Sequence, residues 1–244
     1  MTSPKKKTEA GYQIYLRQIE ALSKVANLIA SGMYLDELLR LIVSVTAEVM
    51  NSKVSSLMVL DHDKKELVIR ATQSISEAYN KKANIKLGEG IAGIVAKENK
   101  PIIVADLLKE PRYLNQGIAR KEGLVSLASV PLAVKGRVIG VLNCYTSQKH
   151  EFTRAELNIL TALANQAALA IENAELALRA HSAEEALYTR KVVERAKEIL
   201  AGEANISPQE SYRLIQKQSM DSRKSMRDIA EAIILAHDLK SKKS

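Results

Sequence analysis

Apolar and polar positions divide the chain into a helical start, a strand-rich middle and a helical end. Over residues 9–31 the apolar side chains step by three and four, the a/d seam of a helix that packs against another helix. A second amphipathic helix is predicted over residues 36–50, with Asp36 as its N-terminal cap. Each helix presents one apolar face, so each needs a packing partner.

Between these helices and residue 146 the pattern becomes that of β-strands. Two hairpins are predicted, one across a turn at 61–65 and one across Lys135–Arg137. The predicted elements are strands at Val54–Leu60, Leu67–Thr72, Ile102–Ala105, Leu124–Val134 and Val138–Thr146, with a short helix after Gly88–Gly93. Antiparallel strand pairs flanked by helices at both ends predict an α+β fold.

A long helix is predicted from Phe152 onward. Its apolar positions keep strict a/d spacing and predict a seam for a partner helix. They are Leu157, Leu160, Ala164, Ala167, Ile171, Ala174 and Leu178. The register fails at His181 and Glu185, and Ser182–Glu185 matches a capping box. Two alternatives stay open: the helix breaks and restarts there, or a stutter in the heptads passes through it.

The residues after about 183 predict a compact all-α unit of three helices. Ser207–Glu210 combines an N-cap serine, proline at the first helical position and glutamate at the third. A last helix is predicted to start near Asp221 or Ser222, and the final residues form a polar tail. A unit this short is near the lower size limit for independent folding.

Composition excludes several classes of site. The single cysteine, Cys144, excludes an internal disulfide and a cysteine cluster around a metal ion, and four scattered histidines disfavour a histidine site. We therefore expect neither a metal nor a cofactor. No apolar run reaches the ~20 residues of a membrane span and no signal peptide is recognisable, so we expect a cytoplasmic protein.

The net charge of +8 permits an anionic partner such as a nucleic acid but does not locate one. Residues 175–244 hold 13 Lys and Arg against 11 Asp and Glu, whereas residues 1–174 hold 23 against 17. The excess is larger outside the predicted three-helix unit. Total charge therefore says little about where a nucleic acid would bind.

Several motifs in the middle of the chain resemble those of a GAF domain, over roughly residues 17–175. They are Leu87–Gly93, Pro101–Asp106, Ser129–Leu132, Gly136–Leu142 and Phe152-Thr153, in the family's order and spacing. The resemblance implies a sensory fold with a six-stranded antiparallel sheet, and many such domains dimerise through their terminal helices. It also implies a small molecule or a partner protein as the signal. The identity of that ligand stays open.

The end of the chain, about residues 183–238, resembles an ANTAR domain. The resemblance rests on Arg195–Leu200, Ser207–Leu214, Ser219–Arg223 and Asp228–Ile233. ANTAR domains are three-helix RNA-binding modules of bacterial transcription antiterminators, and they typically recognise paired hairpins in leader RNA. Many members carry a phosphoacceptor receiver domain upstream. A GAF domain in that place implies a switch other than phosphorylation.

Seven residues are candidates for contact with RNA: Lys191, Arg195, Lys197, Tyr212, Arg223, Lys224 and Arg227. The last three are predicted at the start of the final helix, where cations oppose the helix dipole. Together with backbone N–H groups they would form a phosphate-binding corner. The alternative for them is a solvated face neutralised by Asp221 and Asp228.

The other candidates lie on the first two helices of this unit. Arg195 and Lys197 match basic positions of the family, and with Lys191 they are predicted on the polar side of their helix. Tyr212 would either stack on an unpaired base or fill the small core beside Ile215.

Two features that could indicate other chemistry are weak. Gly88, Gly90 and Gly93 match a phosphate-cradling GxGxxG pattern, but no long buried strand precedes them, so a turn into a helix is the better reading. Cys144 cannot supply both a nucleophile and a resolving thiol, as the GAF-fold reductases of free methionine sulfoxide require. The sequence therefore predicts a non-catalytic sensor.

Together the residues and resemblances predict a homodimeric, signal-responsive antiterminator that binds structured leader RNA. The predicted parts are a tail and helix start at 1–16, a GAF domain at 17–175, a helical linker at 176–182, an ANTAR domain at 183–238 and a polar tail at 239–244. Two alternatives remain: a DNA-binding regulator with a helix-turn-helix, or a protein-interaction module.

Overall fold

The computed structural model describes residues 34–74, 76–81 and 83–241, and the chain divides after Ala174 into two compact units. Each unit is described by itself. The helix predicted over residues 9–31 lies outside the described residues.

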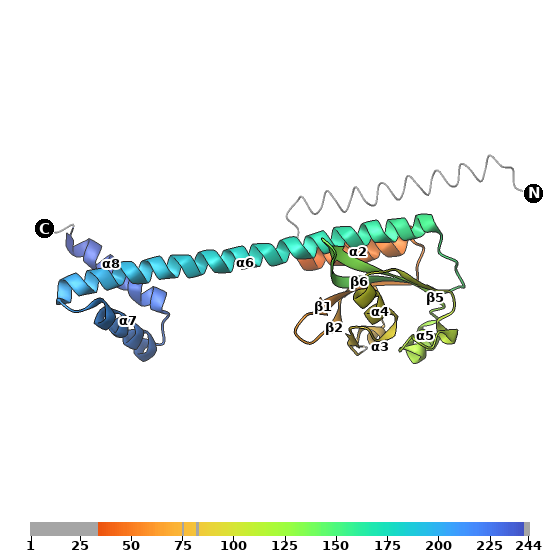
Figure 1. Ribbon diagram of the computed structural model, residues 1–244, viewed down its shortest axis with the longest axis horizontal. Coiled ribbons are helices and arrows are strands. Elements are labelled where there is room, and N and C mark those ends of the chain that lie inside the picture. Colours follow the sequence, from red (N-terminus) through yellow and green to blue (C-terminus); the bar gives the residue numbers. More distant parts are fainter. Residues whose placement is uncertain (1–33, 75, 82, 242–244) are drawn as a thin grey trace, which may run out of the picture. The chain divides into compact units, whose positions relative to one another are not determined.

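The first unit combines one antiparallel sheet with short helices (Figure 1). Its elements are α2 (Leu35–Val49), β1 (Val54–Asp61), β2 (Glu66–Thr72), α3 (Glu77–Asn80), β3 (Ile85–Lys86), α4 (Gly90–Glu98), β4 (Ile102–Val104), the 3-10 turn η1 (Leu107–Lys109), α5 (Gln116–Glu122), β5 (Ser126–Val134), β6 (Arg137–Thr146) and the first part of α6 (Arg154–Ala204). The predicted strands are confirmed to within two residues at each end, whereas β3, α3 and α5 were not predicted.

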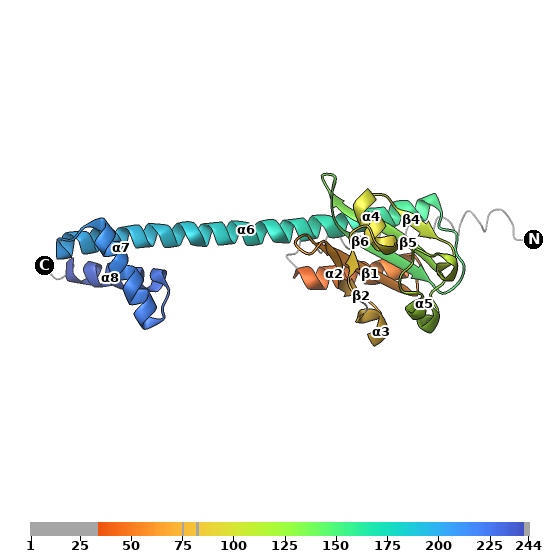
Figure 2. The ribbon, with the colours of Figure 1, turned by 60° about the horizontal axis from the view of Figure 1, so that its bottom comes forward.

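The sheet has six strands in the order β3-β2-β1-β6-β5-β4, and every neighbouring pair is antiparallel. One hydrophobic core lies between one face of the sheet and the helices α2 and α6. A second core lies on the opposite face, under α3, α4 and α5, as Figures 1 and 2 show. The predicted α+β class is confirmed.

The hairpin between β5 and β6 fixes the register at the centre of the sheet. Lys135 and Gly136 form its two-residue turn, with φ angles of +50° and +82°. Two consecutive positive φ angles are typical of the type I′ turn, whose twist matches that of the strands. The tight hairpin predicted at this point is therefore confirmed.

The start of α2 differs from the prediction. The helix begins at Leu35, so Asp36 lies in its first turn instead of capping it. Its carboxylate is 3.0 Å from the Arg70 guanidinium of β2, an exposed ion pair between the helix and the sheet.

The glycines before α4 shape the turn into that helix. Gly88 and Gly90 have positive φ angles, and the helix begins already at Gly90, not after Gly93. A Cβ atom on Gly93 would lie 2.3 Å from the carbonyl oxygen of Lys86, so the backbones pack closely there. The interpretation of this motif as a structural turn agrees with these positions.

The a/d seam of α6 is covered by the first unit itself. Leu160, Ala164, Ala167 and Ile171 are all buried in the core shared with α2 and the sheet. The helix that these residues meet is α2 of the same unit, so they are not available to a helix of a second copy. The reason is that the sheet face and α2 bury the same stripe that a coiled coil would use.

The helix α6 runs unbroken through Ser182–Glu185 and contributes its later part to the second unit. The Ser182 hydroxyl donates to the carbonyl oxygen of Leu178 at 2.9 Å, a bond to the preceding helical turn. Ser182 is thus an interior helical residue and not an N-cap. Of the two alternatives for this segment, the helix continues.

The second unit is completed by α7 (Pro208–Ser222) and α8 (Met226–Ser241). The predicted capping box at the start of α7 is confirmed: the Glu210 N–H donates to the Ser207 hydroxyl, and the Ser207 N–H donates to the Glu210 carboxylate. A small core joins Val193, Ala196, Ile215 and Ala230 from the three helices. The predicted three-helix arrangement is therefore present.

The last helix starts later than predicted, at Met226 instead of near Asp221 or Ser222. Arg223 ends α7 in the left-handed region, with φ at +56°. Ser225 and Asp228 then exchange two hydrogen bonds of 3.1 Å, which form a second capping box.

The close contact of β6 with β1 gives a test of the fold. A Cβ atom on Gly140 would lie 2.2 Å from the carbonyl oxygen of Met58, so we expect Gly140→Ala to lower the free energy of unfolding by at least about 2 kcal/mol. Gly117→Ala is the matched control, because nothing lies within 4 Å of that Cβ position. Urea unfolding followed by the near-UV signal of the buried tyrosines measures both. Equal stability of the two variants would contradict this account of the strand contact.

Candidate functional site

The seven residues predicted to contact RNA are distributed over all parts of the second unit. Lys191, Arg195 and Lys197 lie on α6, Tyr212 on α7, Arg223 and Lys224 in the α7–α8 connection, and Arg227 in the first turn of α8. Six of the seven are cations. The structure separates these six into cations that have a carboxylate partner and cations that have none within ion-pair distance among the described residues.

Arg227 ties α8 to α6. Its Nε donates to Glu231 at 2.8 Å and its NH1 donates to Glu185 at 2.7 Å. The guanidinium carbon also lies 4.5 Å from the centre of the Tyr188 ring, within range of a cation–π contact. The side chain is therefore engaged by its own unit on both sides.

Arg195 and Lys197 are also paired with carboxylates. Arg195 is 3.2 Å from Asp238 of α8, and Lys197 is 2.8 Å from Glu194 one turn earlier on α6. Both pairs lie at the surface, where an ion pair adds little stability and exchanges readily with another anion. Phosphate groups would compete with these carboxylates for the same cations.

Tyr212 stays out of the core of the second unit. Its side chain is 41% exposed on α7, and the Lys197 ammonium lies 5.9 Å from the centre of its ring. The neighbouring Ser211 and Ile215 are the buried residues of that helix. Of the two readings for this ring, the structure favours the exposed one.

The start of the last helix differs from the predicted phosphate-binding corner, because Ser225 and Asp228 occupy it instead of Arg223 and Lys224. Arg223 and Lys224 precede that helix, and Ser225 accepts a hydrogen bond from the Asp228 N–H. Hydrogen bonds from Ser225 hold the pKa of the Asp228 carboxyl below its usual range, so an anion of the protein already occupies this helix end. Arg223 and Lys224 themselves are exposed, without a carboxylate within 4.0 Å among the described residues.

Two further exposed cations were not among the candidates predicted from the sequence. Arg213 and Lys217 lie four residues apart on α7, so they share one face of that helix. Neither forms an ion pair within 4.0 Å in the part of the chain that the structure describes. Because Ser211 and Ile215 are buried, Arg213 and Lys217 lie on the outer face of α7. Their four-residue spacing in the sequence could have indicated a shared basic face.

The first unit contains a small cavity between the sheet and α4. Its volume is about 10 Å³, which is room for one water-sized group. The wall consists of Ile85, Gly90, Ile91, Ala92, Tyr113, Leu114, Asn115, Leu127, Asn143 and Tyr145. None of these side chains carries a charge at neutral pH.

Asn143 of β6 supplies the polar part of this wall. It is 1% exposed, and its Oδ1 accepts a hydrogen bond of 2.7 Å from the Ser129 hydroxyl. Its Nδ2, by contrast, is buried without a hydrogen-bond partner among the described residues. Asn143 was not among the residues predicted from the sequence, although the alternation of β6 places it on the same face as Val141 and Tyr145.

Tyr113 and Tyr145 form part of the cavity wall, and Tyr79 packs against Tyr145. Tyr145 contacts Tyr79 and Tyr113 edge to face, and the Tyr79 hydroxyl is 2.8 Å from that of Ser56. Burial raises the pKa of Tyr113 to about 12, so its hydroxyl stays protonated. Protonated hydroxyls can both donate and accept hydrogen bonds.

Cys144 lies on the opposite face of β6. It is fully buried, and burial raises the pKa of its thiol to about 12. A thiol in this state is a poor nucleophile. The side chain therefore behaves as a small apolar core residue.

Neither a metal site nor a membrane span is found in the described part of the chain. No group of three or more His, Cys, Asp or Glu side chains could hold a metal ion there. No helix among the same residues is both long and apolar enough to cross a bilayer.

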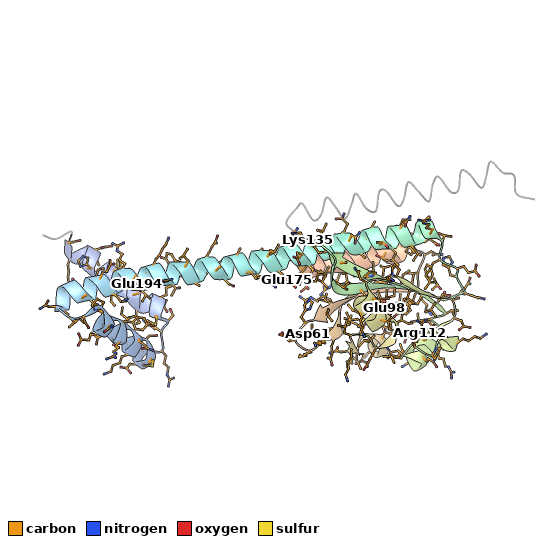
Figure 3. All side chains as sticks on the ribbon, in the orientation of Figure 1. Asp61, Glu98, Arg112, Lys135, Glu175 and Glu194 are labelled. Atoms are coloured by element: carbon orange, nitrogen blue, oxygen red, sulfur yellow. The ribbon has the colours of Figure 1, made fainter. Side chains whose placement is uncertain are left out.

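A charged pair next to the cavity gives a pH-dependent test. Hydrogen bonds from the Arg112 guanidinium, two of them 2.8 Å long, lower the pKa of Glu110 from its ordinary 4.5 to about 2. Because the folded pKa is the lower one, the pair contributes stability above pH 4.5 and loses it as the pH falls towards 2. Arg112 is labelled in Figure 3.

We expect an NMR titration of the Glu110 carboxyl to have its midpoint near pH 2, and near 4.5 in Arg112→Gln. Glu110→Gln identifies the signal. The same midpoint in both proteins would show that the guanidinium does not control this carboxyl.

Two domain families match the chain in sequence. The GAF domain model matches residues 33–172, and the ANTAR domain model matches residues 181–234. The first is a family of sensor domains and the second a family of regulatory domains.

Two curated relatives each resemble a little less than two thirds of the chain. It is 31% identical over 160 residues to a methyl sulfide methyltransferase-associated sensor of Methanosarcina acetivorans, covering 64% of this chain and 16% of that protein. It is 25% identical over 154 residues to a Nif-specific regulatory protein of Herbaspirillum seropedicae, covering 61% of this chain and 28% of that one. The chain thus spans less than a third of the length of these relatives.

A solved structure agrees with the fold of this unit. The GAF domain of a phosphoenolpyruvate-protein phosphotransferase from Coxiella burnetii superposes with a TM-score of 0.61 and 26% identity, covering 69% of this chain and 98% of that one. The match covers nearly all of that GAF domain. The chain therefore belongs to the GAF domain family and carries an ANTAR domain after its GAF domain.

Proposed function

We propose that the protein is a signal-responsive transcription antiterminator of the cytoplasm, without catalytic activity of its own. Its ANTAR domain, at residues 183–238, binds paired hairpins in leader RNA. Its GAF domain, at residues 17–175, controls that binding by sensing a small molecule or a partner protein. The order of the two domain families supports this reading, as does the similarity of part of the chain to a Nif-specific regulatory protein.

The observation that carries the proposal is the set of exposed cations on and after α7, the helix that also exposes Tyr212. Arg213 and Lys217 lie on the outer face of α7, and Arg223 and Lys224 follow at its end. Cations without carboxylate partners are free to neutralise phosphates, and an exposed ring can stack on an unpaired base. RNA hairpins offer both kinds of contact.

The cations that are paired with carboxylates are expected to contribute less to RNA binding than the unpaired ones. Arg195, Lys197 and Arg227 can contact phosphate after they release Asp238, Glu194, Glu185 or Glu231. Lys191 is exposed on α6 and needs no such release among the described residues. The energetic gain per contact is therefore smaller for the paired group.

A DNA-binding role is less well supported. The outer side of α8 exposes Ala232, Leu235, Ala236 and Leu239, which offer few hydrogen bonds to base edges. A recognition helix needs polar side chains on that side.

We further propose that the protein is a homodimer joined through the outer face of α6. The stripe consists of Leu169, Asn173, Leu176, Ala180, Ala183 and Leu187, whose steps of four and three form a heptad seam. All six are exposed, and at 100° per residue they lie opposite the stripe that the first unit buries.

The polar residues along the stripe fit a parallel pair. Asn173 occupies an a position, where a single asparagine favours two strands in one register. Arg179 and Glu184 then take the g and e positions, so Arg179 of one copy faces the partner's Glu184. A dimer presents two ANTAR domains to two hairpins, which makes the second contact effectively intramolecular.

The RNA-binding proposal is tested with the full-length protein, a two-hairpin RNA and a duplex DNA of equal length. We expect Arg223→Gln/Lys224→Gln to weaken RNA binding and to lower the slope of log affinity against log salt by roughly 1–2, since about 0.7–0.9 is lost per phosphate contact. Lys100→Gln/Lys121→Gln is the matched control, because it removes from the first unit two exposed cations that form no ion pair within 4.0 Å among the described residues. Both affinities are measured by fluorescence anisotropy at several salt concentrations.

Equal or tighter binding to DNA would favour the helix-turn-helix alternative. Binding to neither nucleic acid, with or without a GAF signal, would favour a protein-interaction module.

The dimer is tested by sedimentation equilibrium. Leu176→Glu/Leu187→Glu places charges in the stripe, so we expect a shift from dimer to monomer. Leu178→Glu is the control, because this side chain is 69% exposed on the other side of the helix. A dimer that survives the double change but is lost on deletion of residues 1–31 would assign the interface to the N-terminal seam instead.

A further inference from the structure

Two carboxylates surround the single positive charge of Arg227. Glu185 of α6 lies 2.7 Å from its NH1, and Glu231 of α8 lies 2.8 Å from its Nε. By contrast, Arg195 and Lys197 each have one carboxylate within 4.0 Å among the described residues. Arg227 and its two partners therefore carry a net charge of −1, the sum of one guanidinium and two carboxylates.

The two carboxylates reach Arg227 from different helices. Glu231 follows it by four residues on α8, the ordinary spacing of an ion pair on one helix. Glu185 precedes it by 42 residues and belongs to α6. Tyr188 lies on the same helix as Glu185, and the centre of its ring is 4.5 Å from the guanidinium carbon. Removing the charge of Glu185 therefore leaves Arg227 a contact with α6.

Arg227 lies near Lys224, which is exposed and forms no ion pair within 4.0 Å in the described part of the chain. Hydrogen bonds from Ser225 lower the pKa of the Asp228 carboxyl, and the positive charges of Arg227 and Lys224 lower it further. Both cations are thus close to one carboxyl. A phosphate that is attracted to Lys224 therefore comes near Arg227 and meets the carboxylates around it.

The contact between Glu185 and Arg227 opposes a phosphate at this point in two ways. The pair lies at the surface, where 51% of the Glu185 side chain and 36% of the Arg227 side chain are exposed. A phosphate can replace the carboxylate of such a pair, but the pair is then lost. The released carboxylate also stays close to the phosphate, and the two negative charges repel each other.

We propose that Glu185 is an autoinhibitory residue of the RNA interface: its carboxylate holds Arg227 and repels the phosphates that this cation would otherwise bind. The inference rests on the proposed function, because it names a contact that regulates the same surface. Glu185 acts through Arg227, so it is a positioning residue and not a contact of the RNA.

The first experiment measures binding of the full-length protein to the two-hairpin RNA by fluorescence anisotropy at several salt concentrations. We expect Glu185→Gln to tighten binding about threefold to fivefold at low salt, an effect of the size of one surface ion pair. The slope of log affinity against log salt should steepen by up to about 0.7–0.9, the value of one phosphate contact. Glu198→Gln is the matched control, because Glu198 is an exposed glutamate of the same helix without an ion pair within 4.0 Å among the described residues.

The same substitution in a second background tests whether the effect passes through Arg227. We expect Glu185→Gln to leave RNA binding unchanged when Arg227→Gln is also present. A gain that persists without Arg227, or an equal gain in Glu198→Gln, would overturn the proposal, because the lost charge would then act at a distance. Weaker binding by Glu185→Gln would overturn it as well, since the ion pair would then support the interface.

A second experiment needs no RNA. Inorganic pyrophosphate is added to the ¹⁵N-labelled full-length protein, and the side-chain Nε–H signal of Arg227 is followed, with Arg227→Gln to assign it. We expect half-saturation of the shift at a concentration at least about threefold lower in Glu185→Gln than in the unaltered protein and in Glu198→Gln. Equal half-saturation in all three proteins would overturn the proposal, whether or not RNA binds. Failure of the unaltered protein to bind RNA, by contrast, would count against the proposed function alone.

Discussion

The first unit is organised by β6, a strand that is buried on both faces. Leu142 and Cys144 point to the core under α2 and α6, whereas Val141 and Tyr145 point to the core under α4. Both neighbouring strands pair with β6 along most of its length, and Gly140 allows β1 to come within van der Waals reach. Each helix of the unit then packs on a surface that this strand and its neighbours provide. Because side chains alternate along a strand, two different environments meet within adjacent residues.

That alternation explains how a polar site exists inside an apolar domain. A buried amide without a partner typically destabilises a protein by about 1–3 kcal/mol, and Asn143 has one half of its amide in that state among the described residues. Ser129 supports the other half, and the neighbouring tyrosines fill the surrounding volume.

The cations of the second unit fall into two groups, those paired with carboxylates of the same unit and those without such a partner among the described residues. Arg227 and Arg195 connect α8 to α6 through carboxylates, so they contribute to the arrangement of the helices. Arg213, Lys217 and the cations after α7 make no such pairs among the described residues and remain available to an outside anion. Since surface pairs are weak, the two groups differ in degree, and phosphates can recruit the first group after the second.

The sequence by itself determined the α+β class, the central hairpin, the capping box of α7 and both domain families, because these depend on local periodicity, turn chemistry and motifs. Only the tertiary structure decided which stripe of α6 is buried, that α6 continues through Ser182, and that α8 begins at Met226. It also decided that Asn143 faces a cavity and that Arg227 is paired. These outcomes depend on residues far apart in the chain: the sheet competes with a partner helix for one apolar stripe, and distant carboxylates compete with a ligand for one cation. Local patterns cannot rank such competitors.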